Sequence, residues 1–96
     1  YDVLMIADEV VSGFGRTGKW FAMEHFGVEP DIMAVAKGIS SLFVPLGAVI
    51  VSDEVNAPFQ EGVYFNHGFT NQGHPVSCAA ASAVLEILEN IPEKVS

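Results

Sequence analysis

The apolar run from Val3 to Ala7 leads directly into the acidic pair Asp8-Glu9, and a glycine-punctuated segment follows at residues 12–18. A short apolar run bounded by turn residues is typical of a strand buried on both faces, as in a parallel sheet. Asp8 would then lie at the carboxyl end of the strand, the edge at which open α/β sheets bind ligands. The segment therefore predicts a buried strand with a candidate functional acid at its end.

A second apolar run, Ile32 to Ala36, ends at Lys37 and is again followed by a glycine, and a third extends from Leu46 to Val51. Two buried strands that end in an acid and a lysine indicate one shared site rather than two separate surface charges. The alternation of strands with helical segments favours an α/β fold with a mostly parallel sheet and flanking helices.

Helices are expected in three places: Lys19 to Phe26, a short segment between Ser52 and Pro58, and Pro75 to Asn90. Gly27 suits a helix stop, Ser52 suits an N-cap, and proline is well tolerated in a first helical turn. The long helix has a small-residue face, Ala79 to Ala83, and Ile91-Pro92 follows its expected end. Cys78 is expected to be packed on this helix as a small core residue.

The chain has 12 Asp and Glu against 4 Lys and Arg, a formal charge of −8. Such an acidic balance argues against a nucleic-acid surface, which needs clustered basic residues. No apolar run approaches the roughly 20 residues that span a bilayer. A single cysteine cannot form an internal disulfide, which favours a reducing, cytoplasmic compartment. Because the chain begins at Tyr1 and leads at once into a buried strand, we expect residues 1–96 to be one partial domain of a larger protein.

A lysine and a carboxylate at neighbouring strand ends have two interpretations. In the first, Asp8 and Lys37 form a buried ion pair, or one of them caps a turn; such a pair often stabilises no more than apolar residues of equal volume. In the second, the lysine holds an aldehyde cofactor as a Schiff base and the carboxylate pairs with the ring nitrogen, as pyridoxal phosphate requires. Desolvation would favour the unprotonated amine by lowering its pKa. Spacing alone leaves both interpretations open.

Four ordered motifs resemble those of class III aminotransferases, the omega-aminotransferase family of fold type I pyridoxal-phosphate enzymes. They are the segments 6–18, 30–38, 45–48 and 67–75, and the resemblance covers essentially the whole chain. It implies that residues 1–96 are a fragment, incomplete at both ends, of the large cofactor-binding domain.

The resemblance also implies roles for individual residues. Lys37 matches the lysine that holds the cofactor and moves the proton at the substrate α-carbon. Asp8 matches the carboxylate that binds the pyridine nitrogen, and Val10, expected on the same side of an extended chain, matches the apolar residue packed on the ring. Thr70 matches the residue that binds the cofactor phosphate across a homodimer interface, and Phe69 beside it would contribute its backbone.

The remaining polar residues have structural interpretations. Glu9 is expected to be structural or to support the site, with a direct role near the cofactor as the alternative. Arg16 is expected to organise the glycine segment, with binding of a substrate carboxylate as the alternative, and His25 is expected to face solvent. His67 and His74 are expected to shape the loop around Thr70. The three histidines lack the close paired spacing of a metal site, so no metal is expected.

Other parts of the family site lie outside this chain. In the family, the phosphate-binding loop and the ring-stacking aromatic lie upstream, and the substrate-carboxylate arginine lies downstream, so the fragment alone is expected to be inactive. Residues 40–43 stand where relatives carry a glycine-rich or Ser-Gly turn, which puts the local loop geometry in question. The function implied is transamination between an amine or omega-amino acid and an oxo-acid such as pyruvate or 2-oxoglutarate. The alternatives are an aminomutase or decarboxylase of the same family, or a non-catalytic paralogue.

Overall fold

The computed structural model describes residues 1–90. In chain order its elements are β1 (Ile6–Asp8), the 3₁₀ helix η1 (Ala22–Phe26), β2 (Ile32–Val35), the 3₁₀ helix η2 (Lys37–Ser40), β3 (Ala48–Val51), α1 (Asp53–Gln60) and α2 (Pro75–Asn90).

The three strands form one sheet in the order β1-β2-β3. β1 and β2 are parallel, with Ile6 opposite Ile32 and Asp8 opposite Ala34. β2 and β3 are antiparallel, with Val35 opposite Ala48. The expected α/β class is confirmed, but within residues 1–90 the sheet is mixed rather than mostly parallel. The reason is local: between β2 and β3 the chain turns back through η2, and this connection contains no α-helix of the kind that usually joins parallel neighbours.

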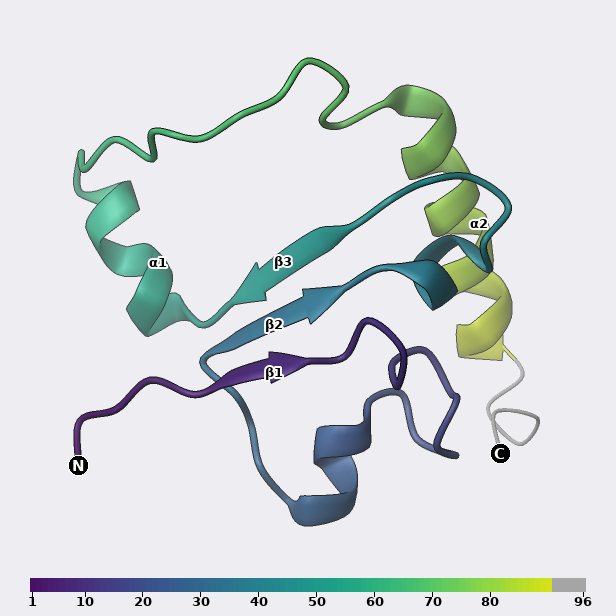
Figure 1. Cartoon of the computed structure of the whole chain (residues 1–96), viewed down its shortest axis with the longest axis horizontal. Helices are drawn as coiled ribbons and strands as arrows, with labels where there is room; N and C mark the ends of the chain where they lie inside the picture. The colour runs from purple at the N-terminus through teal and green to yellow at the C-terminus, as the bar shows by residue number, and fades with distance from the viewer. Residues whose placement is uncertain (91–96) are drawn as a thin grey trace.

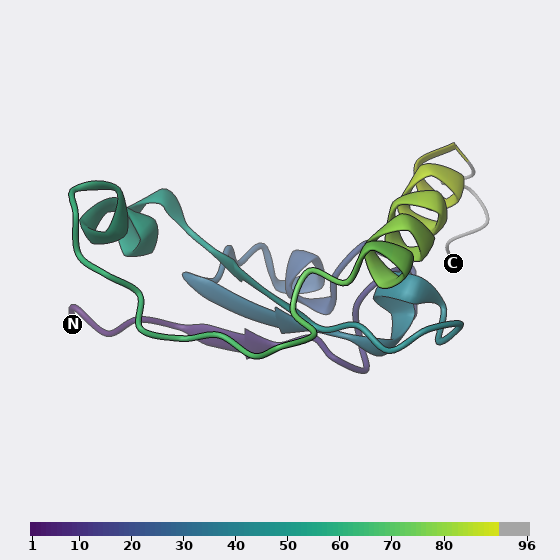
Figure 2. The ribbon, with the colours of Figure 1, turned by 90° about the horizontal axis from the view of Figure 1, so that it is seen from above.

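The helices occupy the ends and one side of the sheet. Figure 1 shows α1 beyond the end of β3 and α2 at the opposite end, beside η2, with an extended irregular segment (61–74) joining them. Seen from above, α1, α2 and η1 all lie on the same side of the sheet (Figure 2). The other side of the sheet therefore carries no helix from the described part of the chain.

The buried core is small and lies where η2 meets α2. Val35, Ile39 and Ala81 form it, and four half-buried side chains pack against it: Phe14, Phe21, Met33 and Leu46. Within residues 1–90, the first apolar run is not buried on both faces as expected, and the third apolar run is exposed as well. Ile6 is 66% exposed, and every residue of β3 is exposed. These side chains stay accessible because helices cover one side only.

The shape agrees with this small core. The Cα radius of gyration is 14.7 Å, against about 12.5 Å for a compact domain of this length. The extents of 41 × 36 × 19 Å describe a thin plate. Little of the apolar surface is therefore buried within the described chain itself.

The helix boundaries agree only partly with those expected. η1 is confined to the last five residues of the predicted Lys19–Phe26 helix, and Gly27 ends it in the left-handed region at φ 64°. The Ser52 side chain caps α1 by accepting a hydrogen bond from Val55 N–H at 3.3 Å. α1 does not stop before Pro58 but includes it.

The long helix α2 has the bounds that the sequence predicted, Pro75–Asn90; the predicted stop at 91–92 lies outside the described residues. The expectation that Cys78 is packed is wrong, since its side chain is exposed. Ser77 and Ala81 are the buried residues of α2, and four-residue spacing puts them on one helix face. Cys78, one residue further on, is turned about 100° away from that face.

Two absences concern the described residues. No helix in residues 1–90 is both long and apolar enough to cross a membrane. That part of the chain also contains no group of three or more His, Cys, Asp or Glu residues placed to hold a metal ion.

Candidate active site

The parallel pairing of β1 and β2 brings Asp8 and Lys37 to the same edge of the sheet. Asp8 is the last residue of β1 and pairs with Ala34. Glu9 N–H donates to Ala34 O at 2.9 Å, so the ladder continues one residue beyond Asp8. Lys37 follows only three residues after Ala34. An amine and a carboxylate therefore lie at the carboxyl ends of adjacent strands, where α/β sheets bind ligands.

The Asp8 carboxylate is exposed and partly fixed by its own turn. Its Oδ1 accepts a hydrogen bond from Val10 N–H at 3.1 Å, an arrangement in which aspartate folds the chain two residues ahead. The chain turns from Val10 onwards. Val10 therefore lies in a turn and not on an extended strand, because the strand ends at Asp8.

Lys37 begins a sharp turn directly after β2. Its φ of +44° lies in the left-handed region, which non-glycine residues seldom adopt. Its carbonyl accepts from Leu42 N–H at 3.0 Å, which closes the turn. Such strained backbone is often found at functional sites. Asp8 and Lys37 are both exposed, so the interpretation as a buried ion pair does not hold.

The turn that follows Lys37 is strained at two further positions. Ser41 and Leu42 have φ values of +50° and +64°, a conformation that glycine adopts without steric cost. These are residues of the 40–43 segment whose lack of glycine put the loop geometry in question. Ser40 is 1% exposed, and its Oγ donates to Val44 O at 2.7 Å. This buried hydrogen bond helps to hold the turn in its strained form.

A hollow of about 370 Å³ opens beside the lysine. Its lining is apolar apart from the amine and consists of Ala36, Lys37, Leu42, Val44, Pro45 and Leu46. The residues predicted around the cofactor other than Lys37 do not line it. The hollow is therefore an apolar space on one side of Lys37 and not a complete site.

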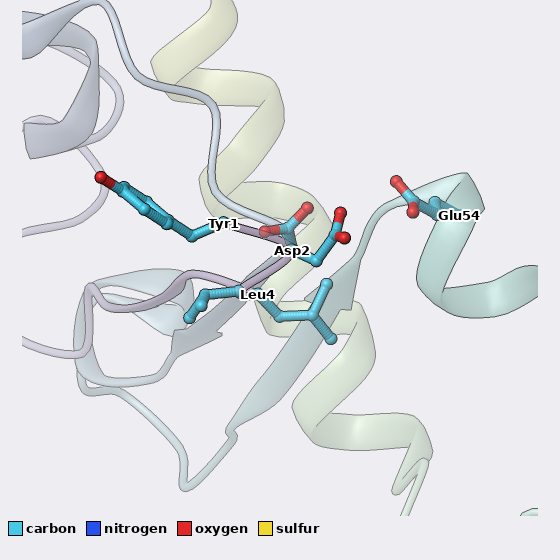
Figure 3. A pocket seen from close by; sticks show the side chains of 6 residues that line it. Tyr1, Asp2, Leu4 and Glu54 are labelled. Atoms are coloured by element: carbon cyan, nitrogen blue, oxygen red, sulfur yellow. The ribbon is translucent and has the colours of Figure 1, made fainter.

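A second hollow, of about 400 Å³, lies at the opposite end of β1. It is lined by Tyr1, Asp2, Val3, Leu4, Asp31 and Glu54. Figure 3 shows Glu54 extending from α1 toward the same space as Asp2. Asp31 Oδ2 accepts Met5 N–H at 2.7 Å, which ties the entry of β1 to the entry of β2. This acidic hollow is at the amino end of the strands, away from Lys37.

The glycine segment packs directly behind the lysine turn. Phe14, at φ +60°, donates its N–H to Trp20 O at 2.6 Å. Its ring meets Phe21 edge-on, with centroids 5.3 Å apart. A Cβ built on Gly38 would lie 3.2 Å from Phe14 Cβ. The segment therefore supports the backbone next to Lys37 rather than opening toward a ligand.

The outer part of the glycine segment is held by a histidine rather than by the arginine. His25 Nε2 lies 2.9 Å from Thr17 O and 3.1 Å from Thr17 Oγ1. His25 is exposed, as expected, but it also bonds the loop. Arg16 is exposed too, and the expectation that it organises the segment is not supported by a hydrogen bond among residues 1–90.

Glu9 is the most constrained polar side chain near the site. It is 2% exposed. Its Oε1 accepts hydrogen bonds from Ser12 Oγ and, at 3.1 Å, from Ala22 N–H, and its Oε2 accepts from Met23 N–H at 3.0 Å. Burial raises the pKa of the carboxyl, but the hydrogen bonds from Ser12, Met23 and Ala22 and the nearby His25 together outweigh it, so the pKa lies below its ordinary value.

Phe69 and Thr70 lie in the irregular segment that leads to α2, and both are exposed. Phe69 O accepts Gln72 N–H at 3.2 Å, which closes a turn around Thr70. His74 Nδ1 accepts Val76 N–H at 3.2 Å, and the His67 ring lies between Phe65 and Phe69. The two histidines thus shape this segment. Neither Phe69 nor Thr70 lines the hollow beside Lys37.

Comparison with known proteins identifies the family of this chain. The family model described as aminotransferase class-III matches residues 1–95. The chain belongs to the class III aminotransferase family.

Named relatives and solved structures agree with this assignment. A putrescine–pyruvate aminotransferase of Pseudomonas aeruginosa is 50% identical over 99% of this chain and 21% of its own length. A structure of an (S)-enantioselective omega-transaminase from Thermomicrobium roseum superposes with a TM-score of 0.86 at 53% identity, covering 92% of this chain and 20% of that one. A taurine:2-oxoglutarate aminotransferase from Bifidobacterium kashiwanohense, in complex with PLP and glutamate, gives 0.88 at 42% identity over 95% of this chain and 21% of that one. The chain thus spans about a fifth of the length of these relatives.

Some contacts near the site follow from the sequence and others do not. Asp8 and Lys37 were both selected from the sequence, and the structure brings them to one edge. The hydrogen bonds of Glu9 to Ala22 and Met23 join residues 13 and 14 positions apart, and no local pattern predicts such a contact. The available signal in the sequence was the second acid, Glu9, directly after Asp8 at the end of an apolar run, since a carboxylate that becomes buried there needs several donors.

Proposed function

We propose that this chain carries one half of a pyridoxal phosphate site in an aminotransferase that moves an amino group between an amine or omega-amino acid and an oxo-acid. The carrying observation is the parallel register that places Asp8 and Lys37 at adjacent strand ends. Relatives named as putrescine–pyruvate aminotransferase and diaminobutyrate–2-oxoglutarate transaminase support this substrate class. They favour transamination over the aminomutase, decarboxylase and non-catalytic alternatives.

The donor set fits this cofactor. Lys37 offers an exposed primary amine, and Asp8 offers an exposed carboxylate whose Oδ1 already accepts Val10 N–H. Asp8 Oδ2 has no hydrogen-bond partner among residues 1–90 and is the oxygen suited to a protonated ring nitrogen. The bound cofactor would act as the electron sink that stabilises a carbanion at the substrate α-carbon.

Each residue then has a definite task. The Lys37 amine would hold the cofactor and, when free, would take and return the proton at the substrate α-carbon. Asp8 holds the proton on the ring nitrogen, because a nearby carboxylate favours the charged form. Val10 packs against the ring.

The phosphate end of the cofactor requires the partner subunit of a homodimer in this proposal. Thr70 supplies its hydroxyl and N–H to the phosphate held by the other subunit, and Phe69 supplies backbone. The cytoplasmic location expected from the cysteine count stays a prediction.

Reduction with borohydride tests the central assignment. In the full-length protein loaded with pyridoxal phosphate, borohydride should fix the cofactor to Lys37, and peptide mapping should recover the label there. Lys19, which is also exposed, provides the internal control. Recovery of the label at Lys19 or any other lysine, with Lys37 unmodified, would overturn the proposal.

A further inference from the structure

We propose that Glu9 is a positioning residue: its buried carboxylate fixes the end of β1 and the glycine segment, and thereby sets how Asp8 and Lys37 face the cofactor. This inference rests on the proposed function. It gives the supporting role expected for Glu9 a definite form, in which named hydrogen bonds control the positions of Asp8 and Lys37.

Glu9 makes hydrogen bonds to three different segments of the chain. Its side chain accepts three, from Ser12 Oγ, Ala22 N–H and Met23 N–H. Its backbone makes two more, since its N–H donates to Ala34 O at 2.9 Å and its carbonyl accepts Gly13 N–H at 3.0 Å. The residue directly after Asp8 is therefore tied at once to β2, to the glycine segment and to η1.

A series of packed residues connects Glu9 to the turn after Lys37. A Cβ built on Gly13 would lie 2.8 Å from Glu9 O and 3.2 Å from a ring carbon of Phe21, so the segment packs tightly on Glu9. Phe21 meets the ring of Phe14, and Phe14 lies against Gly38, the residue after Lys37. A displacement at Glu9 is thus passed on to both partners of the site.

The positioning role of residue 9 requires a carboxylate and not only a side chain of the size of glutamate. The first N–H groups of η1 have no partner within the helix, and Glu9 satisfies two of them with two oxygens. Glutamine has one acceptor oxygen and would place an NH₂ group against a backbone N–H. Leaving a buried donor unpaired forces the surrounding backbone to shift. The variant Glu9→Gln therefore tests the charge and the acceptors at nearly constant volume.

The experiment titrates the absorbance of the bound cofactor against pH in the full-length protein, for wild type, Glu9→Gln, Ser12→Ala and Ser52→Ala. The Asp8 carboxylate favours the protonated ring nitrogen of the cofactor. Moving the carboxylate in Glu9→Gln should therefore lower the apparent pKa of that nitrogen, read from the absorbance change, by about half a unit or more. Ser12→Ala, which removes one donor from Glu9, should show a smaller shift in the same direction. Ser52→Ala removes the cap of α1, so it should lower the melting temperature without a pKa shift.

The outcomes separate this inference from the function on which it rests. If Glu9→Gln lowers the melting temperature as Ser52→Ala does but leaves the apparent pKa unchanged, Glu9 is only structural and the inference fails. If Glu9→Gln does not fold, Ser12→Ala decides, and an unchanged pKa in that variant overturns the inference. If wild type shows no cofactor bound to Lys37, the proposed function itself is wrong and the inference fails with it.

Discussion

Gly38 lies against Phe14 so closely that a Cβ built on the glycine would be 3.2 Å from the Phe14 Cβ and 3.4 Å from Gly13 O. This contact joins the glycine segment after β1 to the turn that presents Lys37 after β2. The two motifs therefore act as one packed unit.

Gly38→Ala in the full-length protein should be destabilising by about 1–3 kcal/mol, because the added methyl group overpacks this contact. Denaturant unfolding measures the change. Gly47→Ala is the matched control: its nearest contact would be Val35 O at 3.5 Å, an ordinary distance, so the methyl group should cost much less there. Equal effects of the two substitutions would contradict the tight packing at Gly38.

Placing a glycine at Leu42, where the backbone is left-handed, should not lower stability as Gly38→Ala does. A non-glycine residue in this region costs about 1–2 kcal/mol, and glycine loses about 0.5–1 kcal/mol to its greater freedom in the unfolded chain. Leu42→Gly should therefore leave stability unchanged or raise it by up to about 1.5 kcal/mol, the difference of these two ranges. Phe43 is also exposed but has no positive φ, so Phe43→Gly should lower the unfolding midpoint. A clear loss of stability in Leu42→Gly would show that its side chain is packed in the whole protein.

Asp8→Asn should slow removal of the substrate α-proton by orders of magnitude, each tenfold being about 1.4 kcal/mol of barrier. The amide keeps the volume but removes the charge that keeps the ring nitrogen protonated. Single-turnover absorbance with the full-length enzyme measures this step. Asp53→Asn, at the exposed start of α1, serves as the control and should react at the wild-type rate. Near wild-type rates in Asp8→Asn would exclude Asp8 as the partner of the ring nitrogen.

The lowered pKa of Glu9 predicts how stability depends on pH. Unfolded, a glutamate titrates near about 4.3; folded, Glu9 titrates lower. Between these values the unfolded state binds more protons, so stability rises with pH. The contribution is complete above the unfolded pKa and is lost as the pH falls through the folded pKa.

Wild type and Glu9→Gln can be compared by denaturant unfolding from pH 7 down to the acid limit of the assay. The stability advantage of wild type should shrink on acidification below the unfolded pKa of about 4.3. An advantage that stays constant through that range, or grows, would contradict the proposed set of hydrogen bonds to the Glu9 carboxylate.

Mixed dimers test the role of Thr70. Thr70→Ala should weaken cofactor retention, and Lys37→Ala should abolish turnover. If Thr70 serves the partner subunit's site, a dimer of the two variants holds both defects in one site and restores the other site. Activity should then return near the fraction expected for random mixing. No recovery, with subunit exchange shown independently, would mean that Thr70 acts within its own chain or not at all.

The sequence by itself determined which residues end the strands and which end the helices. Asp8 and Lys37 follow apolar runs, and Gly27, Ser52 and Pro75 act through local backbone preferences, so short-range patterns were enough to place them. The helix α2 was predicted with its observed bounds for the same reason.

The tertiary structure alone decided three other matters. β3 pairs antiparallel to β2 because the chain turns back after Lys37, and an apolar run does not encode its direction. Glu9 caps a helix that begins thirteen residues later, which depends on how the glycine segment folds back. Cys78 is exposed because the buried face of α2 is that of Ser77 and Ala81, and Ala81 packs with Val35 and Ile39. In each case the outcome depends on what packs against a residue, and that is settled by contacts between segments far apart in the sequence.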